Sequence, residues 1–170
     1  MNEREAASIV AVIAAAFPQW PATKETVAVY ADALSDVDYS EARHAVRDLI
    51  CTEDRWPTIA RIRRQVAGRL GILAPSSAEA WGEVSSQAST SGRSSSPSFT
   101  SPVVAEAVKT VGWWNICQSA NLETMRAQFM RIYEDSQKRH DVEVLLTPGR
   151  ISLDGPRNSV SIGEVVAITK

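Results

Sequence analysis

A chain of 170 residues with 44% hydrophobic and 22% charged residues has the composition of a folded globular protein, long enough for one ordinary core or two small ones. It holds no run of about eighteen apolar residues, which excludes a membrane-spanning sequence, and its amphipathic start carries charges of both signs, unlike a cleavable leader. The net charge is −2, and Cys51 and Cys117 lie far apart without a CxxC pair, so we expect a cytoplasmic protein with two buried thiols.

Two amphipathic helices are predicted at the start of the chain. Residues 3–17 place apolar side chains at intervals of three or four, and Pro18 ends this run. Thr23 can cap a second helix, whose apolar stripe continues to about Ser35.

Two further helices follow after short connections. Asp38 begins the third, and Glu41, three residues on, completes the pattern of a capping box. Thr58 is a good cap for the fourth, which Gly71 ends. About four amphipathic helices joined by short turns predict a compact all-α N-terminal domain over residues 1–74.

Residues 75–101 predict one more helix and then a linker. Ser76 and Glu79 repeat the capping-box spacing, and apolar residues share one face over residues 78–88. The serine-rich stretch 89–97 has almost nothing to bury, so conformational entropy should keep it flexible.

Residues 102–140 predict a smaller helical C-terminal unit. Ser101 and Pro102 provide a cap and a proline at the first helical position, and a last amphipathic helix is expected over about residues 121–138. The tail, residues 141–170, contains only short β-like runs interrupted by Pro-Gly and Gly-Pro steps. We expect it to be flexible or to form a short β-hairpin.

The sequence lacks the motifs of common catalytic sites. It contains no GxxxxGK[ST] phosphate loop, no GxSxG, no HExxH and no glycine-rich dinucleotide turn. His44 has no nucleophile pattern around it, and the acidic residues near helix ends are more typical of capping than of catalysis. We therefore expect a protein that is not an enzyme, with no catalytic residues, no metal site and no cofactor.

The charges are unevenly distributed along the chain. Residues 1–57 hold ten acids and five bases, whereas residues 58–74 contain no acid. The bases of this second stretch are Arg61, Arg63, Arg64 and Arg69. Since the apolar residues of the same helix are needed for the core, we expect most of these guanidinium groups to lie in solvent, where they can bind phosphate or an acidic protein surface. An ordinary solvated helix face is the alternative.

Five tryptophans all fall at predicted helix boundaries or turns, and most should fill the core. Trp113 and Trp114 are adjacent, so at least one of them must point away from the face that the other occupies. We predict that one of the pair is exposed and available to a partner.

The N-terminal half resembles a known family in the order of several short features. An apolar helix ends in an aromatic-proline step, a second helix has an aromatic residue at its midpoint, a leucine precedes an acidic-aromatic turn, and a proline-threonine-isoleucine step begins a later helix. These features are Phe17-Pro18, Tyr30, Leu34 with Asp38-Tyr39, and Pro57-Thr58-Ile59. In this order the segment resembles the N-terminal domain of phage replicative helicase loader/inhibitor proteins, which are replisome organiser-type proteins.

The second half resembles the downstream portion of related phage replication proteins, which extends the resemblance to roughly residues 5–137. It rests on Ala80-Trp81, Phe99, Pro102, Gly112-Trp113, Cys117 and the run from Arg126 to Tyr133. The chain departs from the family pattern between Ser85 and Ser98, where serines replace a basic connection, so rigid coupling of the two halves is not implied.

The resemblance implies a non-enzymatic phage DNA replication adaptor in the host bacterial cytoplasm. Such a protein binds a hexameric replicative DNA helicase, restrains it, and loads it at the origin with help from a replication initiator protein and DNA. Two other classes remain open. A DNA-binding regulator or small terminase-like packaging protein would bind duplex DNA through the basic helix, and an enzyme of unfamiliar type would need no helicase.

Overall fold

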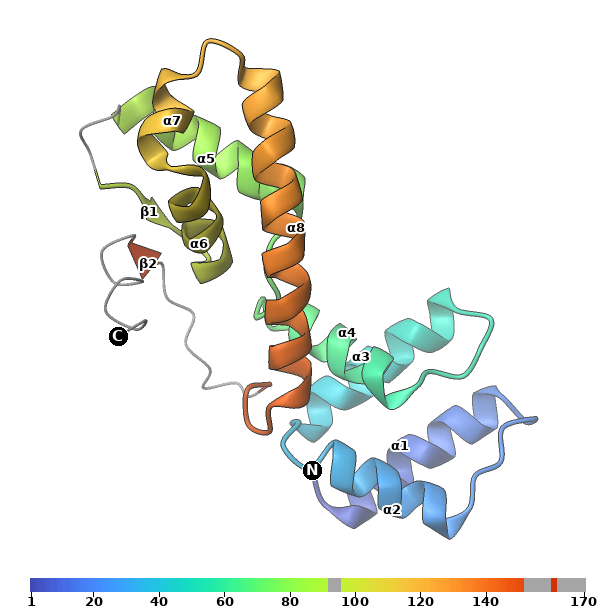
Figure 1. The fold of residues 1–170 in the computed structure, drawn as a ribbon. Coiled ribbons are helices and arrows are strands. Elements are labelled where there is room, and N and C mark those ends of the chain that lie inside the picture. Colours follow the sequence, from blue (N-terminus) through green and yellow to red (C-terminus); the bar gives the residue numbers. More distant parts are fainter. Residues whose placement is uncertain (92–95, 152–159, 162–170) are drawn as a thin grey trace. The chain divides into compact units, whose positions relative to one another are not determined.

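The computed structural model describes residues 1–91, 96–151 and 160–161, and these form an all-α protein with two short strands (Figure 1). The chain divides into two compact units, each described here by itself. Unit 1 comprises Met1–Leu73 with Glu143–Pro156, and unit 2 comprises Ala74–Val142 with Arg157–Lys170. No described helix is long and apolar enough to cross a membrane.

Unit 1 begins with the helices that the sequence predicts. Each has a polar N-cap whose side chain accepts a backbone N–H of the first turn: Asn2, Thr23, Asp38 and Thr58. The helices are α1 (Glu3–Ala16), α2 (Lys24–Ala33), α3 (Tyr39–Thr52) and α4 (Ile59–Arg69).

The core of unit 1 joins residues from both ends of the chain. Ile13, Leu34 and Ile62 are fully buried, and so are Val144 and Ile151 from beyond residue 140. We call residues 143–151 the returning segment. Because two of its apolar side chains belong to this core, residues 1–73 alone do not contain the whole of unit 1.

Unit 2 contains α5 (Ser77–Ser91), β1 (Ser98–Phe99), α6 (Pro102–Val111), α7 (Trp113–Gln118), most of α8 (Leu122–Leu146) and β2 (Val160–Ser161). Ser101 caps α6 and Pro102 follows it, as the sequence predicts. Gly112 joins α6 to α7 with φ of +93°, and a Cβ there would lie 2.9 Å from Asn115 Nδ2. Only glycine fits this turn without strain.

A buried tyrosine hydroxyl donates to a carbonyl before a helix in each unit. In unit 1, Tyr30 Oη donates to Pro57 O at 3.0 Å. In unit 2, Tyr133 Oη donates to Pro75 O at 2.7 Å, and its ring stacks on Phe129. Burial raises the pKa of both hydroxyls, so they remain protonated donors at neutral pH.

Helix α8 is longer than the sequence pattern suggests. The pattern predicts an end near Lys138 and a tail from residue 141, yet α8 continues to Leu146. Burial of Val144 in the core of unit 1 explains the extension, because this residue gains apolar contacts only in the folded unit. A helical end for the last turn could not be read from residues 121–138 alone.

Two other expectations need correction or lie outside the described residues. Strand β2 pairs antiparallel with β1, with Phe99 opposite Val160, so the tail's described strand forms no local hairpin. Helix α5 continues to Ser91, where hydroxyls of its last turns donate to carbonyls four residues back. Residues 92–95 of the expected linker, and residues 152–159 and 162–170 of the tail, lie outside the described residues.

The environment of the cysteines differs from the expectation of two buried thiols. Both are free, but Cys51 is exposed on α3, and Cys117 is half-buried. Cys51 follows Leu49 and Ile50, which face the core more closely, so the helical period turns it outward. Trp56 is likewise exposed, whereas Trp20 and Trp81 are half-buried.

Candidate partner-binding surface on helix α4

Helix α4 presents a core face and a charged face. Ile62, Val66 and Ala67 are fully buried, which fixes the orientation of the helix in unit 1. The four arginines predicted as binding residues therefore differ in their surroundings, and three of them have carboxylate partners from α3 and the turns beside it.

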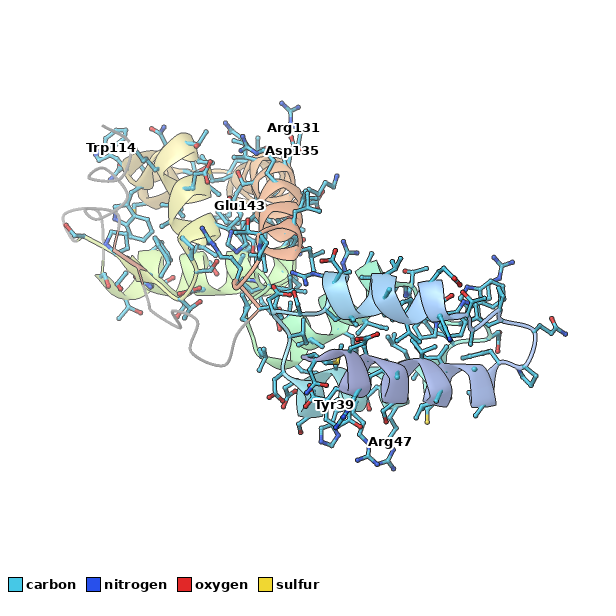
Figure 2. The ribbon with its side chains drawn as sticks, turned by 90° about the horizontal axis from the view of Figure 1, so that it is seen from below. Tyr39, Arg47, Trp114, Arg131, Asp135 and Glu143 are labelled. Carbon is cyan, nitrogen blue, oxygen red and sulfur yellow. The ribbon has the colours of Figure 1, made fainter. Side chains whose placement is uncertain are left out.

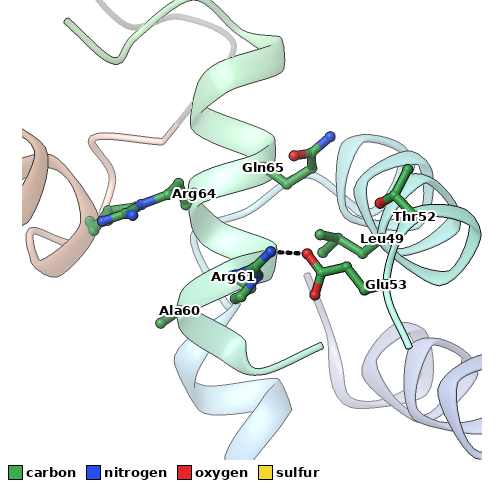
Figure 3. A pocket seen from close by; sticks show the side chains of 8 residues that line it. Leu49, Thr52, Glu53, Ala60, Arg61, Arg64 and Gln65 are labelled. Atoms are coloured by element: carbon green, nitrogen blue, oxygen red, sulfur yellow. Dashed lines mark hydrogen bonds and ion pairs between the residues drawn. The ribbon is translucent and has the colours of Figure 1, made fainter. Parts of the chain in front are cut away.

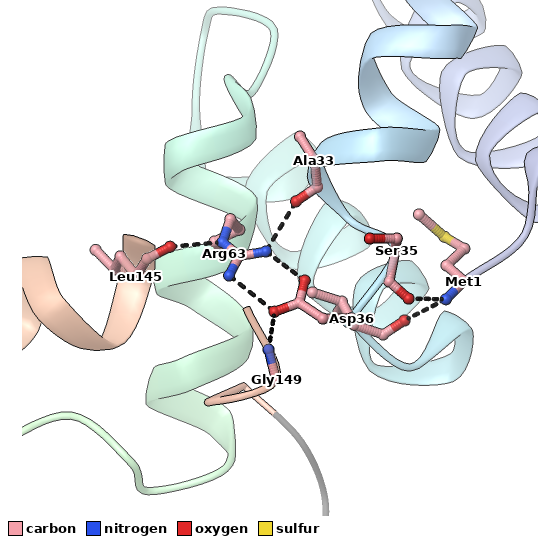
Figure 4. A network of polar contacts seen from close by, with 8 residues as sticks. Met1, Ala33, Ser35, Asp36, Arg63, Leu145 and Gly149 are labelled. Carbon is pink, nitrogen blue, oxygen red and sulfur yellow. Dashed lines mark hydrogen bonds and ion pairs between the residues drawn. The ribbon is translucent and has the colours of Figure 1, made fainter. Parts of the chain in front are cut away.

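Arg63 is buried and serves the fold. Its guanidinium donates to both oxygens of Asp36, at 2.6 and 3.0 Å, and to Ala33 O at 2.8 Å, while Nε donates to Leu145 O at 2.8 Å (Figure 4). The expectation that the arginine head groups lie mainly in solvent is wrong for Arg63. It lies beside Ile62 and three residues before Val66, at the edge of the buried stripe.

Asp36 completes this network and connects it to the returning segment. Gly149 N donates to Asp36 Oδ2 at 2.9 Å (Figure 4). Burial alone would raise the pKa of Asp36, but hydrogen bonds from Arg63 and Gly149 outweigh it and hold the pKa below the ordinary value. The pair is therefore ionised at neutral pH, and it ties the α2–α3 turn, α4 and the returning segment together.

Arg69 and Arg61 are neutralised at the surface. Arg69 donates to Glu41 at 3.2 Å and to Asp48 at 2.9 Å, both on α3. Arg61 pairs with Glu53, just after α3. The acidic front of the sequence thus folds onto the basic helix, so the charge segregation of the sequence is largely cancelled in space.

Arg64 differs from the other three. Its side chain is exposed, and it forms no ion pair with any residue that the structure describes. In Figure 3, Arg61 is turned toward Glu53, and Arg64 extends from α4 in another direction. Arg64 is therefore the arginine of α4 whose guanidinium is available to a partner.

A surface depression of about 450 Å³ lies where α3, α4 and the returning segment meet (Figure 3). We call it the α4 groove. It combines apolar side chains with charged and amide groups from α4 and the end of α3. Its lining residues are Leu49, Thr52, Glu53, Ala60, Arg61, Arg64, Gln65 and Leu145.

A second depression of about 580 Å³ lies beside the Arg63–Asp36 pair. It shares Ala60 and Leu145 with the α4 groove and includes Leu146, whose side chain is 75% exposed. Arg63 and Asp36 in its wall are already paired with each other, so it offers less to a charged ligand than the α4 groove does.

Sequence reasoning found the helix and its arginines but missed Glu53 and Leu145. No local rule joins Glu53 to Arg61 across a loop. A signal for Leu145 existed, since Val144, Leu145 and Leu146 continue the apolar pattern past Lys138, but the nearby Pro-Gly step favours a tail there.

The two candidate tryptophans lie in unit 2. Trp113 is half-buried, with its ring 6.2 Å from that of Phe99 in an edge-to-face arrangement. Trp114 is 60% exposed and points outward (Figure 2), so the prediction that one of the pair is exposed is confirmed. Leu122, at the start of α8, is also 60% exposed.

The described residues contain no group of three or more His, Cys, Asp or Glu side chains arranged to hold a metal ion. His44 is exposed on α3, as is Arg47, which points outward in Figure 2. The charged groups of unit 1 therefore act mainly in ion pairs and capping, as far as the described part of the chain extends.

These features define a small all-α protein with a groove of mixed polarity on its N-terminal unit. Residues 1–63 match the family model for the N-terminal domain of the phage gene 39 protein. This is a phage helicase-associated domain. The match covers α1 to α3 and the first residues of α4, including Arg61, and ends before Arg64. No curated protein and no solved structure matches the chain.

Proposed function

We propose that this protein is a phage DNA replication adaptor that binds, restrains and loads a hexameric replicative helicase at the origin. The observation that carries the proposal is the match of residues 1–63 to a phage helicase-associated domain. The resemblance of roughly residues 5–137 to phage loader/inhibitor proteins supports it further. The site of action is the host bacterial cytoplasm.

An adaptor of this kind needs a stable surface and no chemistry of its own. A bound protein changes the behaviour of a helicase ring when it binds one state of the ring more tightly than another. Unit 1 has a core that is closed by the returning segment, and its α4 groove is bounded by paired charges. Such a pre-organised surface loses little entropy when it binds.

The arrangement of charges favours a protein partner over duplex DNA. Tight binding to the phosphate backbone needs several cations that release counterions. Arg61, Arg63 and Arg69 are each paired with carboxylates, so α4 offers little unpaired positive charge. Contacts with origin DNA and with an initiator protein would then assist the helicase complex and not replace it.

Co-purification tests this proposal. The full-length chain, mixed with the replicative helicase of the phage or its host, should elute with the helicase in size-exclusion chromatography. A chain that forms no complex with either helicase, yet shifts duplex DNA in a salt-dependent gel assay, would instead be a DNA-binding regulator or packaging protein.

A further inference from the structure

We infer that the α4 groove binds an acidic segment of the helicase that carries one apolar side chain beside its carboxylates. This inference rests on the proposed function and names the surface and the chemistry of contact. The groove lies in unit 1, but Arg64 and Leu145, which line it, fall outside the residues that match the family model.

The charges of the groove suit a carboxylate. Arg64 has no ion-pair partner among the described residues, and its planar guanidinium can hold a carboxylate through two parallel hydrogen bonds. The neighbouring Arg61 side chain is 59% exposed in its pair with Glu53. An exposed pair of this kind contributes little to folding, so Arg61 can turn toward a second carboxylate at small cost.

The apolar part of the groove suits one aliphatic or aromatic side chain. Ala60 and Arg64 are one turn apart on the same face of α4, and the small Ala60 side chain leaves space above the helix. Leu49 and Leu145 contribute apolar surface from α3 and the returning segment. A depression of about 450 Å³ is large enough for one such side chain and an adjacent acidic group.

The wall of the groove that contains Leu145 is held in place before any partner binds. Arg63 Nε donates to the carbonyl of Leu145, and the adjacent Val144 is buried in the core. Asp36 accepts from Gly149 four residues further on. The apolar wall is therefore pre-organised, which lowers the entropy lost on binding.

A nucleic-acid occupant fits the groove poorly. Glu53 lies in the groove and would repel a phosphate, and the apolar surface of Leu49 and Leu145 gives a phosphodiester no contact of value. An acidic peptide segment uses both the free guanidinium and the apolar wall.

Charge reversal in the full-length chain tests the inference. Arg64→Glu should weaken binding to the purified helicase by at least about tenfold, because a charge-assisted contact is lost and a repulsive one is introduced. Arg64→Lys should retain much of the binding. The matched control is Arg43→Glu, which makes the same charge change at an exposed position of α3 outside the groove and should leave affinity within about twofold.

The outcomes separate the inference from the function on which it rests. If the wild-type chain forms no helicase complex, the proposed function fails. If the complex forms and Arg64→Glu binds as tightly as the wild type, the groove assignment alone is overturned. Loss of duplex DNA binding in Arg64→Glu, with helicase affinity unchanged, would overturn it as well.

A cross-linking experiment identifies the segment directly. The photoreactive residue p-benzoylphenylalanine replaces Gln65, which lines the groove on α4. After irradiation of the complex, mass spectrometry should find the cross-link in a helicase segment that contains Asp or Glu next to an apolar residue. A cross-link confined to a basic or uncharged segment would contradict the inference.

Discussion

The guanidinium of Arg63 and the carboxylate of Asp36 show how little a charge pattern reveals about burial. Arg63 and Arg64 are neighbours with the same side chain, yet Arg63 is 8% exposed and Arg64 is open to solvent. Helical periodicity places both on α4, but the position of Asp36 depends on a turn that is 27 residues away. Tertiary ion pairs of this type cannot be read from spacing along one helix.

The buried pair should contribute strongly to stability. Arg63→Met removes one partner and leaves the Asp36 carboxylate buried, so we expect the free energy of unfolding to fall by about 3 to 5 kcal/mol. Urea denaturation measures this change. Arg64→Met, at the neighbouring exposed position, should change it by less than about 0.5 kcal/mol. Equal effects of the two substitutions would show that Arg63 is not the buried member.

The lowered pKa of Asp36 predicts a pH dependence of stability. Because the folded pKa lies below the unfolded value of about 3.9, the unfolded chain binds more protons in the acid range, and stability falls as the pH is lowered through that range. Asp36→Asn should therefore be less stable than wild type at pH 7. The difference should shrink as the pH falls below about 4. Denaturation curves at pH 7 and pH 3 with an identical difference would contradict this account.

At the scale of helices, the sequence predicts what local contacts determine. Thr23, Asp38, Thr58 and Ser101 can be identified as caps because each bonds to a backbone N–H within three residues. The end of α8 and the partner of β2 escape such reasoning, because both depend on packing against residues far away in the sequence. The α4 groove escapes it in the same way, since one of its walls belongs to the returning segment.

The returning segment should behave as part of the core of unit 1. Ile151→Ala removes apolar contacts from a fully buried position, so we expect the free energy of unfolding to fall by about 2 to 4 kcal/mol. Arg150→Ala is the matched control, because the neighbouring side chain is 47% exposed and its ion pair is with the exposed Glu143. A chain in which both substitutions are neutral in urea denaturation would show that residues 143–151 are not part of that core.

At the scale of the whole molecule, the family match and the structural division do not coincide. The match ends at residue 63, whereas unit 1 needs the returning segment to complete its core. We expect variants of the full-length chain to be more informative than a fragment that ends after α4. The exposed Trp114 of unit 2 is a second candidate contact, and its substitution can be compared with that of Arg64 in the same helicase assay.

The proposed adaptor should have no nucleotide chemistry of its own. We expect the purified full-length chain neither to bind nor to hydrolyse ATP, because its sequence contains no phosphate-binding glycine loop. Calorimetric titration with ATP and a phosphate-release assay measure both properties. Turnover above that of a buffer blank, retained through repeated purification, would contradict the proposal that the chain is not an enzyme.

The most direct test of the helicase-adaptor account is the ATPase rate of the purified replicative helicase during titration with the full-length chain. We predict a change of at least about twofold that saturates as the complex fills, because the adaptor favours one state of the ring. Arg64→Glu should shift this titration to higher concentration, and Arg43→Glu should not. A helicase rate that stays constant at concentrations of the wild-type chain far above that of the helicase would contradict the account.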